Sequence, residues 1–482
     1  MIGMTLADVA AVTGGRLHRA TGEERVASVE FDSREAAPGV LFLALPGEHV
    51  DGHSFAAAAV AAGAAGVLAA REVDAPSVVV PPATGAAGTY LAEHDPGGAG
   101  AAVLAALARL ARHSVDSLPG LAVVGVTGSS GKTSTKDLLA AVLAPLGPTV
   151  APPGSFNNEL GHPWTALRAD AGTRHLVLEL SARGPGHVAA LCRVAPPRIG
   201  VVLNVGRAHL GEFGSPEAIA QAKGELVEAL PADGVAVLNA DDAAVAAMAS
   251  RTAARVVPVG LGAGALVRAV DVTSDAGRAR FRLVTPAGEA DVALRLVGAH
   301  HVGNALSAAA VAVELGATPA GVAESLSAAA PASRWRMEVA DRADGVTVVN
   351  DAYNANPESM RAALVALADM GRDRRTWAVL GRMAELGDTA AAAHAEVAAA
   401  AAELGVGALV AVGEPGYGST ARHVTDPAAA LALLRAEVTP GDVVLVKASR
   451  AVGLDRVAAA LLADGAGPEP RDDRQENELV SR

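Results

Sequence analysis

Cysteine, aromatic residues and lysine are all scarce in this sequence of 482 residues, and each scarcity excludes something. The only cysteine, Cys192, rules out an internal disulfide framework and is typical of a reducing cytoplasm. Aromatic residues form 2% of the chain, whereas hydrophobic residues, mostly alanine and valine, form 51%. We therefore expect a cytoplasmic protein whose α/β domains are held together by aliphatic packing.

We also expect no basic surface stripe, no membrane span and no secretory leader. The net charge of −13 argues against binding along a nucleic-acid backbone. Residues 54–70 carry no charge, but they are alanine and glycine and too short to cross a bilayer, so we interpret them as a buried helix. The N-terminus has an acid at Asp8 and no basic leader, which favours the absence of a secretory signal. We expect no nucleic-acid partner, no membrane insertion and a monomer.

Lysine is rare even though basic residues are not. The chain has 39 lysines and arginines together, of which only Lys132, Lys136, Lys223 and Lys447 are lysines. A lysine kept in such a sequence indicates a place where a compact ammonium group or a modifiable amine is needed, which arginine cannot supply. The alternative is random scatter along the chain.

The length predicts about three domains, at roughly 100–200 residues each. From 121 onward, short apolar strands alternate with longer helical stretches, which is typical of parallel sheets with crossover helices. A Pro/Gly/Thr-rich stretch and the break SAAAPAS divide the chain. We predict an α/β protein with a small N-terminal domain (1–82), a linker (83–100), a central phosphate-loop domain with a parallel sheet (101–331), a Rossmann-like C-terminal domain (332–465) and a disordered tail (466–482).

The stretch LAVVGVTGSSGKTSTKDLL (121–139) resembles a phosphate loop with one irregularity. The strict motif needs a glycine where Val126 stands, and Gly128 follows two positions later. An apolar strand nevertheless precedes the glycines and a helical pattern follows them, so backbone N–H groups and the helix dipole can face a phosphate. Lys132 would contact the outer phosphates and Thr133 would help to hold Mg²⁺. The alternative is a plain glycine turn entering a helix; we predict a variant nucleotide loop.

Two residues that follow apolar strands are candidate metal ligands. Glu179 ends HLVLEL, and His209 lies in the loop after RIGVVLNV. Ligands gather at the carboxyl ends of strands in open α/β sheets, although either residue alone could be a solvated loop residue.

Further polar residues stand in motifs that their spacing leaves ambiguous. Lys223 lies on a predicted amphipathic helix (216–230) with glutamates nearby, so it could be a surface lysine paired with acids. Asn304 stands at a helix start, where it could merely cap. Arg336 follows the domain break. The loop VVNDAYNANPESM could be a turn rich in capping side chains, and it contains Asp351, Tyr353, Asn354 and Asn356.

The order of these motifs carries a resemblance. TGSSGKTSTKDLL, GSFNNELG, LELSARGPGH, NVGRAHLGEFGS, QAKGELVEAL, GAHHVGNALSAAA and NDAYNANPESM occur in succession and resemble the Mur ligases of peptidoglycan synthesis. The likeness covers nearly the whole chain, and NDAYNANP is similar to the branch of the family that adds D-alanyl-D-alanine. The resemblance implies an N-terminal UDP-substrate domain, a central ATPase domain and a C-terminal ligase domain.

The resemblance also implies a role for each motif. ATP would lie on Thr127, Gly128, Ser129, Ser130, Gly131, Lys132, Thr133 and Ser134. Lys132, Glu179, His209 and Lys223 would be catalytic. Mg²⁺ would be held by Thr133, Glu179, His209 and Lys223, the lysine acting as a carbamate.

The adenine would approach Asn304, and Arg336 and Asp351 would reach the nucleotide from the C-terminal domain. The uridine part of the substrate would lie at Ser33 and Arg34. The remaining substrate contacts would be Asn157, Asn158, Tyr353, Asn354, Asn356, Lys447 and Arg450.

Five positions depart from the family pattern, and none removes a proposed ligand. Ser181 and Arg207 stand close to the expected metal residues, so they bear on turnover rate more than on reaction type. The other three are Asn350, Arg382 and Ala448.

The implied reaction is amide formation driven by ATP. ATP would convert the terminal carboxylate of UDP-N-acetylmuramoyl-tripeptide into an acyl phosphate, which the amine of D-alanyl-D-alanine would attack. A Mur ligase adding one amino acid, or a different dipeptide, is the alternative. A GTPase switch is disfavoured because none of the four lysines follows an asparagine, as a guanine-binding motif requires.

Overall fold

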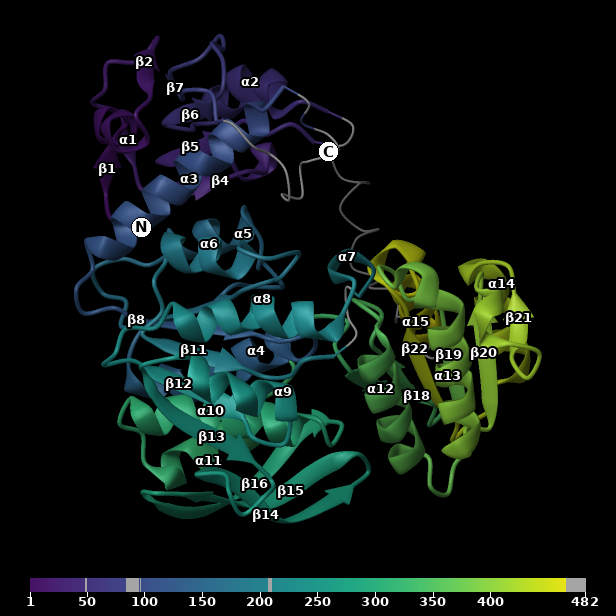
Figure 1. Cartoon of the computed structure of the whole chain (residues 1–482). Helices are drawn as coiled ribbons and strands as arrows, with labels where there is room; N and C mark the ends of the chain where they lie inside the picture. The colour runs from purple at the N-terminus through teal and green to yellow at the C-terminus, as the bar shows by residue number, and fades with distance from the viewer. Residues whose placement is uncertain (48–49, 84–94, 96, 207–209, 465–482) are drawn as a thin grey trace, which may run out of the picture. The chain divides into compact units, whose positions relative to one another are not determined.

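The computed structural model describes residues 1–47, 50–83, 95, 97–206 and 210–464. Most of the expected linker and the tail from 466 lie outside these residues. The chain forms two compact units. The first consists of 1–272, 280–295 and 300–333, and the second of 273–279, 296–299 and the chain from Arg334. Alternating strands and helices fill both units (Figure 1), so the expected α/β class is confirmed.

A small sheet begins the first unit. Its five strands have the order β2-β7-β6-β5-β4, and all pairs except β2 with β7 are parallel. The elements of this region are β1 (Met4–Thr5), α1 (Leu6–Thr13), β2 (Arg16–His18), β3 (Arg25–Val26), β4 (Ser28–Glu30), β5 (Val40–Leu43), α2 (Ala56–Ala61), β6 (Gly66–Ala69) and β7 (Ser77–Val79).

The alanine-rich segment 54–70 is not one buried helix, contrary to the expectation. Helix α2 ends at Ala61, and two of its six residues are buried. Gly63 has a φ of +116°, a conformation that breaks the helix, and the chain then enters the fully buried strand β6. The buried part of this segment is mainly the strand: every residue of β6 is buried, whereas most of α2 is exposed or half-buried.

The central sheet has nine strands in the order β16-β15-β14-β13-β12-β11-β8-β10-β9, and the pairs from β9 to β14 are parallel. Its strands are β8 (Ala122–Thr127), β9 (Thr149–Val150), β10 (His175–Glu179), β11 (Ile199–Val202), β12 (Val235–Asn239), β13 (Arg255–Gly260), β14 (Val267–Asp275), β15 (Arg278–Thr285) and β16 (Gly288–Val297). The last three strands follow one another through tight turns and were not predicted.

Helices cover the parallel part of this sheet. Helices α6 and α8 share one apolar cluster, and α4, α10 and α11 contact one another. Helix α8 begins where Ser215 accepts a bond from Ala218 N–H and Pro216 occupies the first turn. The helices are α3 (Ala99–Asp116), α4 (Lys132–Leu143), α5 (Gly161–Ala166), α6 (His187–Val194), α7 (Leu210–Phe213), α8 (Pro216–Glu228), α9 (Ala243–Ala246), α10 (His301–Glu314) and α11 (Pro319–Ala328).

The lone thiol lies inside the first unit. Cys192 on α6 is buried in the cluster that α6 shares with α8. Burial, and then the negative charge of Glu225, raise the pKa of this thiol to about 12. The side chain therefore stays protonated and serves as a small apolar group.

Within the described ranges, no helix is both long and apolar enough to cross a membrane.

The second unit has a six-stranded sheet in the order β17-β18-β22-β19-β20-β21, parallel except for β17 with β18. Alternate residues of β19 face opposite sides: Trp377 packs with α14 and α15, and Ala378 with α12 and α13. The elements are β17 (Glu338–Asp341), β18 (Thr347–Asn350), α12 (Pro357–Met370), β19 (Thr376–Leu380), α13 (Ala390–Glu403), β20 (Ala408–Val412), β21 (Arg422–Val424), α14 (Pro427–Glu437), β22 (Val443–Lys447) and α15 (Asp455–Ala463).

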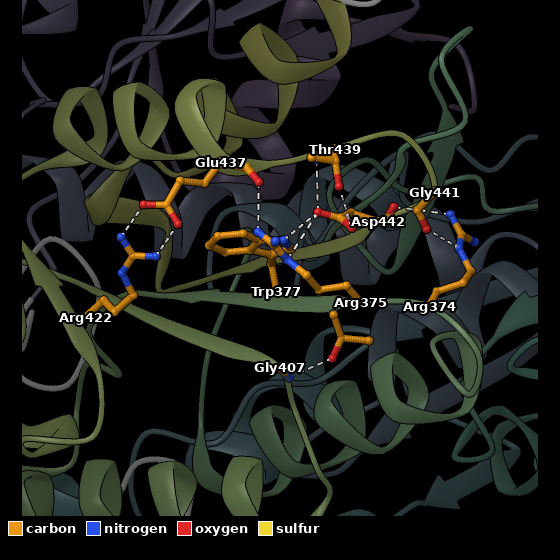
Figure 2. Close-up of polar contacts among 10 residues, drawn as sticks. Arg374, Arg375, Trp377, Gly407, Arg422, Glu437, Thr439, Gly441 and Asp442 are labelled. Atoms are coloured by element: carbon orange, nitrogen blue, oxygen red, sulfur yellow. Dashed lines mark hydrogen bonds and ion pairs between the residues drawn. The ribbon is translucent and has the colours of Figure 1, made fainter.

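A buried carboxylate links the amino ends of β19 and β22. Figure 2 shows Asp442 accepting from the indole N–H of Trp377 at 2.9 Å and from the backbone N–H of Thr439 at 3.0 Å. The guanidinium of Arg375 lies 4.4 Å from the centroid of the Trp377 ring and 3.5 Å from Asp442. Arg422, paired with Glu437, approaches the same ring at 6.0 Å. The indole is thus both a hydrogen-bond donor and a cation–π platform.

We expect Trp377→Phe to destabilise the protein by about 1–3 kcal/mol, because a buried carboxylate loses a donor. Urea unfolding followed by circular dichroism measures the loss. Combined with Asp442→Ala, the same substitution should cost less, because its acceptor is already gone. Strictly additive losses in this double-mutant cycle would contradict the coupling.

Candidate active site

The irregular phosphate loop has a simple structural reason. Val126 lies inside β8 and pairs with Glu179 of β10 and Val201 of β11, so the turn begins only after Thr127. A Cβ on Gly128 would stand 2.9 Å from the Cβ of Leu203. The glycine at 128 is required by this close approach, and a glycine at 126 would only weaken a buried strand.

The second loop glycine meets a different helix. Gly131 has a φ of +83°, and a Cβ there would stand 2.8 Å from the Asn304 side-chain oxygen on α10. Helix α4 begins directly afterwards at Lys132. Asn304 was considered a possible cap, but it lies within the first turns of α10, and the capping position is His300. The phosphate loop and Asn304 are therefore in direct contact.

Lys132 and Thr133 stand at the N-terminus of α4, where helix dipole and backbone N–H groups favour an anion. The Lys132 ammonium donates to the Gly128 carbonyl at 2.6 Å, folded back over the loop. The Thr133 hydroxyl donates to the Glu179 carboxylate at 3.2 Å. Both Thr133 and Glu179 are buried. The structure thus brings the predicted hydroxyl and the predicted carboxylate together, supplying the oxygen ligands that Mg²⁺ prefers.

Glu179 is also reached from the loop that precedes α5. The Ser155 hydroxyl and the Asn157 amide each lie 3.5 Å from the same carboxylate oxygen. Ser181, a departure from the family pattern, donates to the Asn157 carbonyl from its N–H at 2.9 Å and from its hydroxyl at 2.8 Å. Asn158 instead accepts from the N–H groups of Leu160 and Gly161, at the start of α5.

The expected histidine ligand cannot be placed in this site. His209 and Arg207 lie outside the described residues. Among the residues that are described, no group of three or more His, Cys, Asp or Glu side chains forms a metal cage. A magnesium ion at a nucleotide does not need one, because it is bound through one or two carboxylates, phosphates and water.

Lys223 is not a surface lysine paired with acids. It lies on the inward face of α8, 2% exposed. Glu225 accepts from the N–H groups of Gly186 and Ala189, and Glu228 pairs with Arg251. Burial, and then the nearby charge of Lys132, hold the pKa of Lys223 well below its ordinary value. The structure thus presents an amine that readily becomes neutral.

Lys136 received no role from the sequence beyond its rarity. Its ammonium is buried, donates to the Pro152 carbonyl at 2.8 Å and to the Ser333 hydroxyl at 3.3 Å, and pairs with Asp137. Asp137 also accepts from the Ser333 N–H at 3.2 Å. One helical turn after Lys132, this pair holds the phosphate-loop helix against two distant segments of the first unit.

Residues at the carboxyl ends of β18 and β22 converge in the second unit. The buried Lys447 ammonium lies 2.6 Å from Asp351 and 2.8 Å from the Asn354 carbonyl. Burial lowers the pKa of Lys447, and the Asp351 carboxylate opposes that change. The Arg336 guanidinium lies 4.2 Å from the ring centroid of Tyr353.

Two other predicted residues of this unit have clear structural partners. Arg450 lies 3.9 Å from the centroid of the Trp335 ring and pairs with Asp455 at 2.7 Å. Asn356 caps α12 in a reciprocal arrangement with Ser359, which is the capping alternative.

The N-terminal candidates lie on a short 3₁₀ turn after β4. Ser33 and Arg34 open this turn, and the Arg34 guanidinium pairs with Asp32 at 2.5 Å. The Arg34 side chain is 86% exposed, so it is open to a ligand. Its side-chain bond to Asp32 lowers the pKa of that carboxyl to about 2.

Comparison with known families matches three parts of the chain. Residues 25–114 match the "Mur ligase family, catalytic domain", residues 126–312 the "Mur ligase middle domain" and residues 335–450 the "Mur ligase, glutamate ligase domain".

Individual proteins match over almost the full length. The UDP-N-acetylmuramoyl-tripeptide–D-alanyl-D-alanine ligase of Mycobacterium tuberculosis H37Rv is 55% identical, covering 96% of this chain and 98% of its own. The Escherichia coli K12 ligase of the same name is 34% identical, covering 96% and 100%.

Solved structures also match over almost the full length of the chain. MurF from Acinetobacter baumannii superposes with a TM-score of 0.83 at 30% identity, covering 96% of this chain and 99% of its own. MurF ligase from Thermotoga maritima, solved in complex with ADP, gives 0.76 at 29% identity, covering 91% and 98%.

We expect Gly131→Ala to weaken nucleotide binding at least tenfold, because the added Cβ is strained at this φ and meets Asn304. Titration with ADP in the presence of Mg²⁺ measures the effect. Gly303→Ala is the matched control: it lies on α10 beside Asn304, and its added Cβ would have no neighbour within 4 Å. Equal affinity of the two variants would contradict the contact.

Proposed function

The chain belongs to the Mur ligase family, and we propose that it joins D-alanyl-D-alanine to UDP-N-acetylmuramoyl-tripeptide at the expense of ATP. One observation carries this proposal: a phosphate loop stands directly over the buried Glu179, in a chain 55% identical to a ligase of that name along nearly its full length. The products are the extended UDP-linked peptide, ADP and phosphate.

The carboxylate of the tripeptide is the group to be activated. ATP transfers its γ-phosphoryl group to this carboxylate, giving an acyl phosphate, and the amine of the dipeptide then displaces phosphate to form the amide. Lys132, now bonded to the Gly128 carbonyl, is placed to turn toward the γ-phosphate and offset its charge. The first-turn N–H groups of α4 hold the phosphates in line.

Mg²⁺ is the expected companion of the nucleotide. The Thr133 hydroxyl and the Glu179 carboxylate, 3.2 Å apart, would hold it, with His209 as a further candidate. When bound, the ion neutralises charge that develops on the phosphoryl oxygens.

Lys223 is proposed to act as a carbamate. Its amine would add to CO₂ and release a proton, giving an N-carboxylate that contributes oxygen ligands beside the nucleotide. Only a neutral amine can react in this way, and burial favours the neutral form of Lys223.

We propose that residues of the second unit bind both the nucleotide and the dipeptide. Arg336 and Asp351 are proposed to reach the ATP, and Tyr353, Asn354, Asn356, Lys447 and Arg450 to lie toward the dipeptide. The Lys447–Asp351 bond joins one residue of each group. In the first unit, Ser33 and Arg34 would meet the uridine, and Asn157 and Asn158 the remainder of that substrate.

Phosphate release by the purified protein should require ATP, UDP-N-acetylmuramoyl-tripeptide and D-alanyl-D-alanine together. A coupled phosphate assay measures this requirement, and Lys132→Ala should abolish the signal. Release that follows a single free amino acid, or a different dipeptide, would replace the assignment with the corresponding alternative ligase.

Lys223→Ala should lower turnover at least tenfold, and short carboxylic acids such as acetate should partly restore it by replacing the missing carboxylate. Turnover measured with and without added acetate tests this. Arg251→Ala is a control, since it removes a charge that pairs with α8 from outside and should show no rescue. A Lys223→Ala variant as active as the parent excludes the carbamate.

A further inference from the structure

The loop that follows β11 is hydrogen-bonded to the phosphate loop through the side chain of Asn204. The Asn204 amide pairs with the backbone of Ser130 on both sides: its oxygen accepts from the Ser130 N–H at 2.9 Å, and its nitrogen donates to the Ser130 carbonyl at 3.1 Å. The Asn204 carbonyl accepts from the Ser129 N–H at 3.2 Å. The Gly206 N–H donates to the Ser129 hydroxyl at 2.9 Å.

These bonds determine which backbone amides face a nucleotide. The N–H groups of Ser129 and Ser130 point to Asn204, so the loop's anion-binding amides come from Gly131 and the first turn of α4. The first glycine of the strict motif is replaced by Val126 inside β8, and Asn204 supports the remaining loop through its two bonds to Ser130.

The residues before and after Asn204 are each fixed by a hydrogen bond to their backbone. The Asn239 amide, at the end of β12, donates to the Leu203 carbonyl at 2.8 Å. The Asp242 carboxylate accepts from the Val205 N–H at 2.8 Å while also capping α9. Leu203 in turn lies against Gly128. The position of the Asn204 amide is therefore set before any nucleotide arrives.

We propose that Asn204 is a positioning residue for ATP: its amide shapes Ser129 and Ser130 so that the amides after them, and Lys132, meet the outer phosphates. The proposal rests on the function above only in requiring that a nucleotide bind at this loop. Asn204 acts through the phosphate loop and does not take part in the chemistry.

Asn204→Ala should raise the dissociation constant for ADP with Mg²⁺, and KM for ATP, about tenfold, while KM for UDP-N-acetylmuramoyl-tripeptide changes less than twofold. Asn204→Asp should be weaker still, because it keeps the acceptor for Ser130 N–H but loses the donor and adds a negative charge near the phosphates. Calorimetric titration and steady-state kinetics measure the two quantities.

Thr285→Ala is the matched control for lost hydrogen bonds. Its hydroxyl donates to the Gly288 carbonyl and accepts from the Ala287 N–H, at the turn between β15 and β16. It should leave both KM values unchanged.

The outcomes separate the two claims. If the parent protein does not bind ADP, the proposed function fails. If the parent binds ADP and Asn204→Ala binds it within twofold, the inference alone is overturned. Equal weakening of both substrates in Asn204→Ala would indicate a general structural defect and also overturns it.

Discussion

Parallel pairing of β8 with β10 on one side and β11 on the other is the constraint on which the site depends. Glu179 stands opposite Val126, and Val202 stands opposite Thr127, so all three strands end at the same edge of the sheet. The loops that leave them must then meet, and the phosphate loop is enclosed between a carboxylate and an amide. The register brings the loops to one edge, and the side chains of Thr133, Glu179 and Asn204 then complete the hydrogen bonds.

Local patterns made part of this arrangement predictable. The turn after an apolar strand, the helix at Lys132 and the carboxylate ending β10 could all be read from neighbouring residues. Asn204 and Lys136 could not, because their partners Ser130 and Ser333 lie 74 and 197 positions away. Segment 54–70 was misread because alanine favours a helix, whereas Gly63 and tertiary burial create a strand.

Rarity proved informative for lysine. Lys136, Lys223 and Lys447 are each 2% exposed, and Lys132 is half-buried at the phosphate loop. Arginine forms surface pairs in this protein, such as Arg422 with Glu437. A guanidinium is too broad and too permanently charged for these interior positions, whereas an ammonium is compact and can lose its proton.

The unpredicted strands β14 to β16 alternate polar and apolar residues, which is a strand pattern that the sequence analysis did not use.

The buried thiol of Cys192 has a practical consequence. A cysteine with a pKa near 12 inside an apolar cluster reacts slowly with maleimides and iodoacetamides, which attack through the thiolate. Cysteines introduced on the surfaces of the two units could therefore be labelled with a donor and an acceptor dye without first removing the native residue. The chain can thus be used without removing Cys192 in single-molecule fluorescence experiments that test whether its two units move during a catalytic cycle.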